Sequence, residues 1–343
     1  MSDKYLWNRS GDPDPHVTRL ENLLGTLRHR PGALDYTRMP APPPVRLPFW
    51  NLRRGLLAVA AVAIVILATG FWVGSSPRPE PVAHGPWLAT SLHGAPTLKS
   101  APLRNASRVA AEEWIETDAD SSVRLSAGGV GMVDIGPGTR VRVVRTRSGE
   151  HRLALERGSL HAHIWAAPGR FSVETPSVTA LDLGCSYRIE VDAAGAGSLR
   201  VTLGWVGLDY RGVESLVPHG ATCALMPGKG PGTPYFDDAP RALVEALAVI
   251  DTGEPGARAA AVEAAIVAAR PRDALSLWHL LWRVDRDHAG RIYTRLVEFA
   301  PPSPAVTREL VMARDRGTLE AWWNTLGYGN ADLFRIWRAR PGV

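Results

Sequence analysis

The sequence predicts a protein of several parts: a single transmembrane helix, an all-β domain built as a sandwich or a β-helix-like roll, and a C-terminal all-α helical array. Three observations lead to this fold class. Residues 55–74 form an uncharged apolar run, short β-type runs separated by turn residues begin near residue 109, and apolar residues after 236 recur at helical spacings. A chain of 343 residues is long enough for about two domains.

The first 54 residues form a basic arm, predicted to be cytoplasmic, with one short amphipathic helix and a Pro-rich spacer at 40–48. Asp14 followed by Pro15 is a helix-start signal, and apolar residues then recur at spacings of three and four. Because so short a helix is marginal on its own, it either docks on a partner, or packs on its own N-terminal residues or along a membrane surface. Docking would use the candidate partner-binding residues Trp7, Val17, Leu20, Leu23, Leu24 and Leu27.

Residues 55–74 are predicted to cross a membrane once. Twenty helical residues, at about 1.5 Å each, span the roughly 30 Å of a bilayer core. Arg53 and Arg54 end the run on one side, and basic residues are more frequent before the run than after it. The positive-inside rule therefore predicts a single-pass protein of the inner membrane, with a cytoplasmic N-terminus and a periplasmic C-terminus.

The net charge of +5 agrees with this topology. Residues 1–54 hold nine Lys and Arg against five Asp and Glu, so most of the excess positive charge belongs to the arm. A nucleic-acid-binding protein would instead carry its basic residues on a folded face. We therefore expect no direct contact with nucleic acid.

Beyond the span, residues 75–108 are predicted to form a Pro-rich connector and residues 109–235 an all-β domain. Gly and Pro residues separate many short β-type runs, which is typical of a sandwich, a barrel or a β-helix-like roll. In the run TRVRVV, Val141 and Val143 face one way and the two arginines face the other. This alternation predicts a strand with one buried face.

Five short motifs follow one another over about residues 109–218, within the runs WIETDADSSVRL, HRLALERGSL, FSVETP and LDLGCSYRIEV. Their order resembles that of the periplasmic FecR domain. Two departures are that Cys185 stands where the family usually has Thr and that AGGVGMVDIG lacks the usual Asp-Gly-Ser. The matching residues are Thr117, Asp118, Ala119, Asp120, Ser121, Leu155, Gly158, Phe171, Val173, Thr175, Pro176, Leu183, Gly184, Tyr187 and Val191.

The resemblance implies a membrane-anchored regulator of the anti-sigma kind. In FecR-like proteins the cytoplasmic end contacts an extracytoplasmic-function sigma factor, and the periplasmic end receives a signal from an outer-membrane transporter. The expected partners are therefore such a sigma factor and an outer-membrane or periplasmic protein. The alternative is a periplasmic scaffold, or a ligand- or polymer-binding envelope protein, with no transcriptional role.

Residues 236–343 are predicted to form an α-helical domain. Leu243, Leu247 and Ile250 make one apolar stripe, and further stripes follow with proline breaks between them, which indicates a HEAT-like or bundle array. Most of the tryptophans here are expected in the core. Trp322 and Trp323 are adjacent, and neighbouring helical positions cannot both face one core, so an exposed pair would be a candidate contact site.

No catalytic, cofactor or metal site is predicted. His161 and His163 share one face of a strand, but no cysteine or clustered carboxylate joins them in the sequence. The hydrolase, nucleotide-binding and zinc-protease motifs are absent from the sequence. We therefore expect a non-enzymatic protein with no cofactor and no bound metal.

Cys185 and Cys223 are the two cysteines of the chain. Disulfides persist outside the cytoplasm, so the pair is a candidate disulfide. Both cysteines are flanked by β-type residues, and two buried free thiols fit the sequence equally well. Spacing does not show whether the two Cα atoms come within bonding reach, so both alternatives stay open at this point.

Overall fold

The chain divides into two units, Met1–Ser76 and Pro77–Val343. The predicted span at 55–74 and all arm and topology residues named above (Trp7, Val17, Leu20, Leu23, Leu24, Leu27, Arg53 and Arg54) lie outside the described residues. The computed structural model describes residues 19, 87–147, 149–253, 255–332 and 335.

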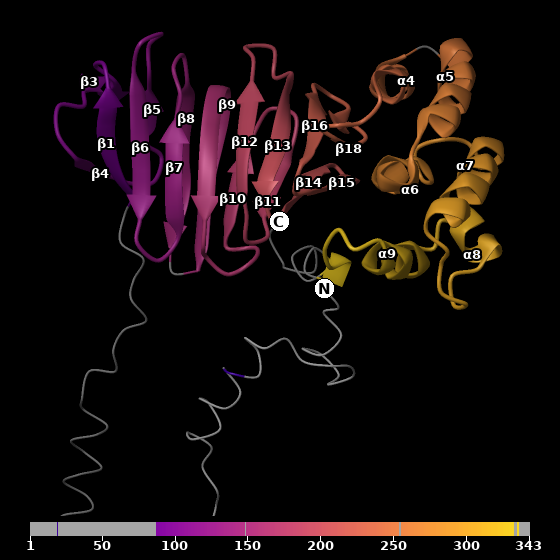
Figure 1. The fold of residues 1–343 in the computed structure, drawn as a ribbon. Helices are drawn as coiled ribbons and strands as arrows, with labels where there is room; N and C mark the ends of the chain where they lie inside the picture. Colours follow the sequence, from indigo (N-terminus) through magenta and orange to yellow (C-terminus); the bar gives the residue numbers. More distant parts are fainter. Residues whose placement is uncertain (1–18, 20–86, 148, 254, 333–334, 336–343) are drawn as a thin grey trace, which may run out of the picture. The chain divides into compact units, whose positions relative to one another are not determined.

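The first two thirds of the described chain consist of β-strands joined by short turns (Figure 1). The strands are β1 Trp87–His93, β2 Thr97–Leu98, β3 Ala101–Pro102, β4 Ser107–Val109, β5 Trp114–Glu116, β6 Ser122–Ala127, β7 Gly131–Ile135, β8 Arg140–Arg147, β9 Glu150–Ile164, β10 Phe171–Glu174, β11 Thr179–Asp182, β12 Ser186–Val191, β13 Gly197–Leu203, β14 Trp205–Tyr210, β15 Val213–Pro218, β16 Ala221–Met226, β17 Gly230–Pro231 and β18 Tyr235–Phe236.

These strands pair in two series that share β9. One series runs β4, β1, β6, β7, β9, β12, β13 and β16, with β17 and β18 both on β16. The other runs β3, β2, β5, β8, β9, β10, β11, β14 and β15. After their first strand, both series advance in chain order, so the β region extends from β1 and its neighbours at one end to β16 and β18 at the other (Figure 1). The sheet is mixed, because β10 lies parallel to β9.

Strand β9 changes from one series to the other at Gly158. Its first half pairs with β8 and β10, and its second half pairs with β7 and β12. Gly158 has a φ of +96°, and a Cβ atom there would lie 2.2 Å from Oγ1 of Thr139. Only glycine fits this position, since other residues are strained at positive φ and would clash as well.

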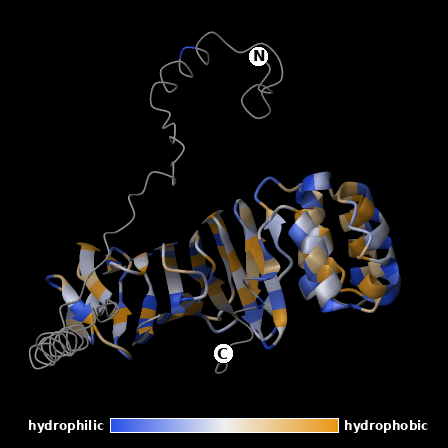
Figure 2. Ribbon diagram, turned by 90° about the horizontal axis from the view of Figure 1, so that it is seen from below, coloured by the Kyte–Doolittle hydropathy of each residue, from blue (hydrophilic) through white to orange (hydrophobic). Residues whose placement is uncertain are grey.

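The alternation expected from the sequence is present where it was predicted. Val141 and Val143 in β8 are fully buried, and the arginines between and beside them are partly exposed. Buried residues from both series belong to one hydrophobic core. In the hydropathy colouring of Figure 2, apolar and polar residues alternate along many of the strands.

The β region begins earlier than the sequence suggested. Residues 75–108 were predicted to be a connector, yet β1 to β3 and most of β4 lie in this range. Trp87 at the start of β1 is fully buried, and its ring lies 6.0 Å from the ring of Phe171. The proline content of this segment wrongly indicated a connector. Pro102 occupies a two-residue strand at the edge of the sheet, where a missing N–H is tolerated.

The predicted C-terminal helical region is confirmed. Leu243, Leu247 and Ile250, the first predicted stripe, are buried in α4. The helical elements of the described chain are α4 Arg241–Thr252, α5 Pro255–Ala268, the 3-10 turn η2 Pro271–Asp273, α6 Ala274–Leu280, α7 Arg286–Phe299, α8 Arg308–Met312 and α9 Arg316–Thr325.

The predicted fold class needs one correction, which concerns the transmembrane helix. No helix within the described ranges is long and apolar enough to cross a membrane. The longest there, α5 and α7, have 14 residues each, which corresponds to about 21 Å of helix, well short of a bilayer core. The fold class supported by the structure is a large mixed sheet followed by a C-terminal helical region.

Helix α6 joins the sheet to the other helices. All seven of its residues are buried. Ser276 donates a hydrogen bond to the carbonyl of Pro234 at 2.7 Å, and the backbone N–H of Leu216 in β15 donates to Nε2 of His279 at 3.0 Å. The sheet and the helices therefore meet through specific polar contacts as well as through apolar packing.

Candidate functional site: a cleft between the sheet and the helices

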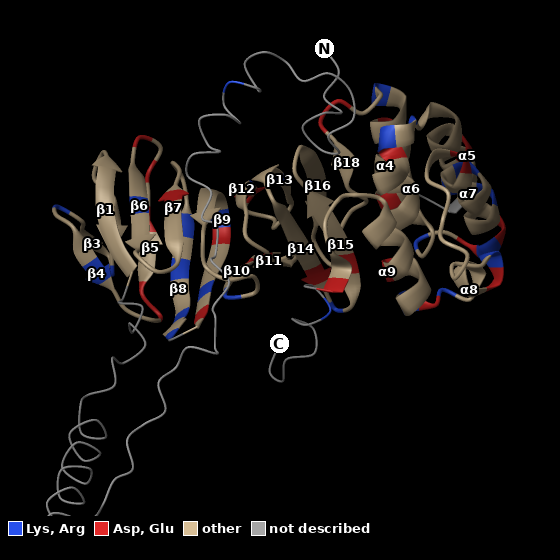
Figure 3. Cartoon of the chain, turned by 60° about the horizontal axis from the view of Figure 1, so that its bottom comes forward, with Lys and Arg blue, Asp and Glu red and all other residues tan. Residues whose placement is uncertain are grey.

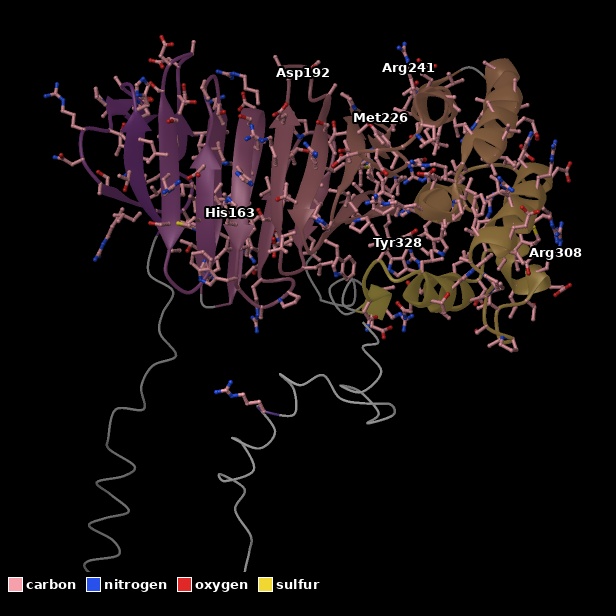
Figure 4. All side chains as sticks on the ribbon, in the orientation of Figure 1. His163, Asp192, Met226, Arg241, Arg308 and Tyr328 are labelled. Atoms are coloured by element: carbon pink, nitrogen blue, oxygen red, sulfur yellow. The ribbon has the colours of Figure 1, made fainter. Side chains whose placement is uncertain are left out.

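A cleft with a volume of about 490 Å³ lies where β15 and β17 meet helices α4, α5, α6 and α9. Met226, labelled in Figure 4, lies on its sheet side. Five basic and three acidic side chains of the described residues line the cleft together with an apolar wall. The basic residues are Lys229, Arg258, Arg283, Arg314 and Arg316, the acidic ones are Glu214, Asp251 and Glu320, and the apolar ones include Val213, Leu216, Met226, Trp278, Trp282 and Leu319.

Arg283 is the charged group that connects the two sides of the cleft. It follows α6, and its side chain is only 10% exposed. Its guanidinium donates to the backbone carbonyls of Glu214 at 2.8 Å and Pro231 at 3.1 Å, and to Oγ of Ser215 at 2.7 Å. A planar guanidinium has five donors, so one buried side chain can hold several strand carbonyls at once.

Asp251 supplies the negative charge next to this arginine. Its side chain is 9% exposed, and Oδ1 lies 3.7 Å from Nη1 of Arg283. The same carboxylate accepts hydrogen bonds from the backbone N–H of Thr233 at 2.6 Å and from its hydroxyl at 2.8 Å. Burial lowers the pKa of Arg283, and the charge of Asp251 acts in the opposite direction. The pair thus compensates charges that would otherwise be buried alone.

His279 lies under the cleft in neutral form. Its Nδ1 is 2.8 Å from the carbonyl of Leu275, and its Nε2 accepts the N–H of Leu216. Nδ1 therefore carries the proton that it donates to Leu275, because Nε2 is occupied as an acceptor. Burial, and then the charge of Arg283, lowers the pKa of His279 to about 3. An imidazole of this kind is a structural hydrogen-bonding group and not a proton carrier near neutral pH.

Three further cations of the cleft have no carboxylate partner among the described residues. Lys229, Arg258 and Arg314 donate to backbone carbonyls of Thr252, Arg283 and Val284, at 3.3, 2.5 and 2.6 Å. In addition, Nε of Arg258 is buried without a hydrogen-bond partner in the described part of the chain. The local excess of the cleft is therefore positive.

The acidic groups of the cleft, in contrast, are paired with arginines. Glu214 lies 2.8 Å from Nη2 of Arg316, and its side chain is 14% exposed. Glu320 is 6% exposed and accepts from Arg335. With Asp251 bound to Arg283, every acidic side chain that lines the cleft has a cationic partner.

Trp278 and Trp282 line the cleft, and Trp323 packs against Trp278. The ring of Trp278 lies 4.2 Å from that of Trp282 and 4.8 Å from that of Trp323. Trp322 instead packs on Tyr293 of α7, at 5.5 Å. Both Trp322 and Trp323 are fully buried, so the exposed-pair alternative is wrong. Adjacent helical positions point about 100° apart, and here each ring meets a different neighbouring helix.

The motif residues singled out in the sequence form turns and core. Phe171, Val173 and Tyr187 are buried. Oγ1 of Thr117 donates to the carbonyl of Gly136 at 2.7 Å and accepts the N–H of Thr139 at 2.8 Å. These contacts hold neighbouring strands together, so the motif encodes the scaffold of the β region.

Ion pairs follow the outer side of β5, β8 and β9, where blue and red residues lie close together in Figure 3. Arg140 lies 3.2 Å from Glu116 and 2.7 Å from Glu156, and its guanidinium stacks over Trp114 at 4.1 Å. The charges are matched across neighbouring strands and are partly exposed. Such pairs contribute little to stability individually.

His161 and His163 do lie side by side on β9, as the sequence indicates. Their ring centroids are 4.1 Å apart, and Oγ of Ser186 lies 2.9 Å from Nδ1 of His163. Burial lowers the pKa of His161, as does the nearby His163. Within the described ranges, no group of three potential metal ligands gathers.

Both cysteines are free and buried, so the candidate disulfide between Cys185 and Cys223 is not formed. The thiol of Cys185 donates to Oδ2 of Asp182 at 2.6 Å, and the thiol of Cys223 donates to the carbonyl of Gly232 at 3.1 Å. Burial raises the pKa of Cys185, and it raises that of Cys223 to about 12. Both thiols are therefore held in the protonated, unreactive form.

We expect the thiols of Cys185 and Cys223 to be unreactive toward Ellman's reagent in the native protein and to react fully after denaturation. The reason is that the reagent needs an accessible thiolate, and both side chains are at most 2% exposed. The measurement is the absorbance of the released thiolate at neutral pH with and without denaturant. A disulfide would instead give no reaction in denaturant until a reductant is added.

Sequence reasoning did not find the cleft. Its charged lining comes from residues spread between Glu214 and Glu320, and no local motif joins them. One signal was available. Arg283 ends the run LSLWHLLWR, and a charged residue next to an apolar helical stripe indicates that the charge has a buried partner. The partners themselves, on β15 and β17, could not be read from the run.

The described β region matches a known family. Residues 113–206 match the family described as FecR protein. No match was found among curated protein sequences. Two crystal structures of a proposed anti-sigma factor from Parabacteroides distasonis share 17% identity with the chain, each over 39% of it, with a TM-score of 0.32. The matches cover 63% and 62% of those chains, which is less than two thirds of their length.

Proposed function

We propose that this chain, whose residues 113–206 match the FecR family, is a regulatory protein that relays a signal from its folded body to a sigma factor. The folded body is the described region 87–332, and the sigma factor would be of the extracytoplasmic-function type, bound by the arm at 1–54. The observation that carries the proposal is the extent of the family match. It runs from just before β5 to the start of β14 and includes β9, which both series of strands share.

Three features support a binding and relay role over a catalytic one. The ordered short motifs build turns and core, as Thr117 and Phe171 show, so these residues serve as scaffold. The acids of the cleft are paired, and the buried His279 beneath the cleft is neutral with a pKa of about 3, which is far from the value expected of a general base near neutral pH. The arm adds an apolar stripe at helical spacing, which suits docking on a partner.

We expect the full chain to co-purify with an extracytoplasmic-function sigma factor of its own organism, and the triple variant Leu20→Ser, Leu23→Ser, Leu24→Ser to lose it. Polar groups on the stripe remove the apolar surface that would be buried in the complex, at roughly 25 cal/mol per Å². The measurement is affinity purification of the tagged full chain after co-expression with each such sigma factor in turn.

The matched control changes the other face of the same predicted helix, in the double variant Glu21→Ser, Asn22→Ser. It should retain the sigma factor, since these positions lie off the apolar stripe. Equal retention by the triple variant, or capture of no sigma factor by the wild-type chain, would contradict the proposal.

Deleting residues 1–40 separates the relay from a scaffold or envelope-binding role. In a relay, the deletion changes transcription from the promoters that the sigma factor serves, because the cytoplasmic partner loses its contact. In a scaffold, the folded body keeps its role without the arm and transcription is unchanged. A reporter fused to a sigma-dependent promoter distinguishes the two results.

A further inference from the structure

The cleft has the dimensions and the position of a small-molecule site. Its volume of about 490 Å³ falls within the range of roughly 300–1,000 Å³ typical of such sites. Its walls come from strands on one side and helices on the other, and Arg283 ties the two sides together through bonds to Glu214, Pro231 and Ser215. The walls formed by β15, β17, α6 and α9 are regular elements, and preformed walls reduce the entropy that binding costs.

The apolar wall provides a flat surface. Trp278 is 1% exposed and fixed by a hydrogen bond from its Nε1 to the carbonyl of Leu319 at 2.9 Å. Trp282 packs edge-on against it and remains partly exposed at the cleft. An aromatic or aliphatic group placed here would cover indole surface that now faces the cleft.

The polar wall provides positive charge that the described residues leave uncompensated. Among the described residues, Lys229, Arg258 and Arg314 donate to backbone carbonyls and have no carboxylate partner, whereas the acids of the cleft each have an arginine. Arg314 has a φ of +56°, at the end of α8, where glycine is the favoured residue. Guanidinium and ammonium groups bind carboxylate and related anions by charge-assisted hydrogen bonds.

We propose that the cleft binds a small organic anion, with its charged group held by Lys229, Arg258 and Arg314 and its apolar body against Trp282. This goes beyond the regulatory role, because binding of the anion is a property of the folded body and is tested without a sigma factor. A cationic ligand is disfavoured, since the acidic side chains of the cleft already have arginine partners. A neutral apolar ligand would gain no interaction with the three basic groups.

The test uses the full chain with 2-naphthoate and its neutral counterpart 2-naphthamide, each measured by equilibrium dialysis. Naphthoate should bind with one-to-one stoichiometry and at least about tenfold more tightly than naphthamide, since a hydrogen bond to a charged group is worth about a factor of ten or more. Arg314→Gln and Lys229→Gln should each weaken naphthoate by a factor of about ten and leave naphthamide unchanged. Trp282→Leu should weaken both ligands.

The matched control is Arg241→Gln, whose side chain is 91% exposed on α4 and lies outside the cleft (Figure 4). It should bind naphthoate like the wild-type chain. Because Lys229 and Arg314 are exposed residues, their variants should keep the far-ultraviolet circular dichroism and the melting temperature of the wild type. Equal affinity for naphthoate and naphthamide, or naphthoate binding that survives both cleft substitutions, overturns the proposal.

Discussion

Replacing Arg283 by methionine is expected to lower the free energy of unfolding of the folded body by about 3–5 kcal/mol, the range observed when one partner of a buried ion pair is removed. The side chain is 10% exposed, and its loss leaves Asp251 as a buried charge without its cation. The substitution also removes the donors to the carbonyls of Glu214 and Pro231. Urea denaturation followed by tryptophan fluorescence measures the change.

A second substitution separates the effect of charge from that of packing. In the double variant Arg283→Met, Asp251→Asn, the uncompensated carboxylate is gone, so part of the lost stability should return. Arg241→Met is the control, because its pair with Glu245 is exposed, and exposed pairs contribute little. A double variant no more stable than Arg283→Met alone would show that the buried charge is not the cause.

Acidification is expected to destabilise the folded body through His279. Its pKa is about 3 in the folded chain and about 6.5 when unfolded, so between these values the unfolded state binds a proton that the folded state does not. The stability contributed by the neutral imidazole is complete above pH 6.5 and falls as the pH drops toward 3. At 1.36 kcal/mol per pH unit, this one group lowers the unfolding free energy by roughly 3 kcal/mol between pH 6.5 and 4.

Asp182 changes the unfolding free energy with pH in the direction opposite to His279. The proteins compared below therefore both lack the Asp182 carboxyl group. Burial raises its pKa to about 7, so the folded state binds a proton between pH 3.8 and 7 that the unfolded state lacks. The stability that it contributes is therefore present below pH 3.8 and is lost as the pH rises to 7. The wild type shows the sum of the two effects, which partly cancel.

The measurement compares Asp182→Asn with the double variant Asp182→Asn, His279→Gln, by urea denaturation from pH 7 to pH 4. Glutamine retains an oxygen that can accept the N–H of Leu216, but it does not titrate. The unfolding free energy of Asp182→Asn should fall steeply on acidification, and that of the double variant much less. Parallel pH profiles for the two proteins would be inconsistent with a neutral, buried His279.

Local periodicity explains why the strands and helices could be predicted. In β8, alternation placed Val141 and Val143 on the buried face, because successive side chains of a strand point to opposite sides. In α4, the spacing of Leu243, Leu247 and Ile250 identified the buried stripe. Both patterns depend on neighbours within a few residues, so no knowledge of the tertiary structure was needed.

Predictions failed where a distant contact decides the outcome. Trp87 lies in a segment rich in proline and looked like part of a connector, yet pairing of β1 with β4 and β6 buries it completely. Trp322 and Trp323 could not both be assigned to one core, but two helices, α6 and α7, each receive one ring. The two cysteines, similar in sequence context, found separate hydrogen-bond acceptors in Asp182 and Gly232.

The sequence by itself determined the β-to-α order of the chain and the family of its β domain. Both rest on short motifs and on periods of two or about 3.6 residues, which are local properties. Only the tertiary structure decided the cleft. Arg283 lies 69 residues from Glu214 and 52 from Pro231, and His279 lies 63 from Leu216. Contacts across such separations depend on how the helices fold back on β15 and β17, and no local pattern specifies that path.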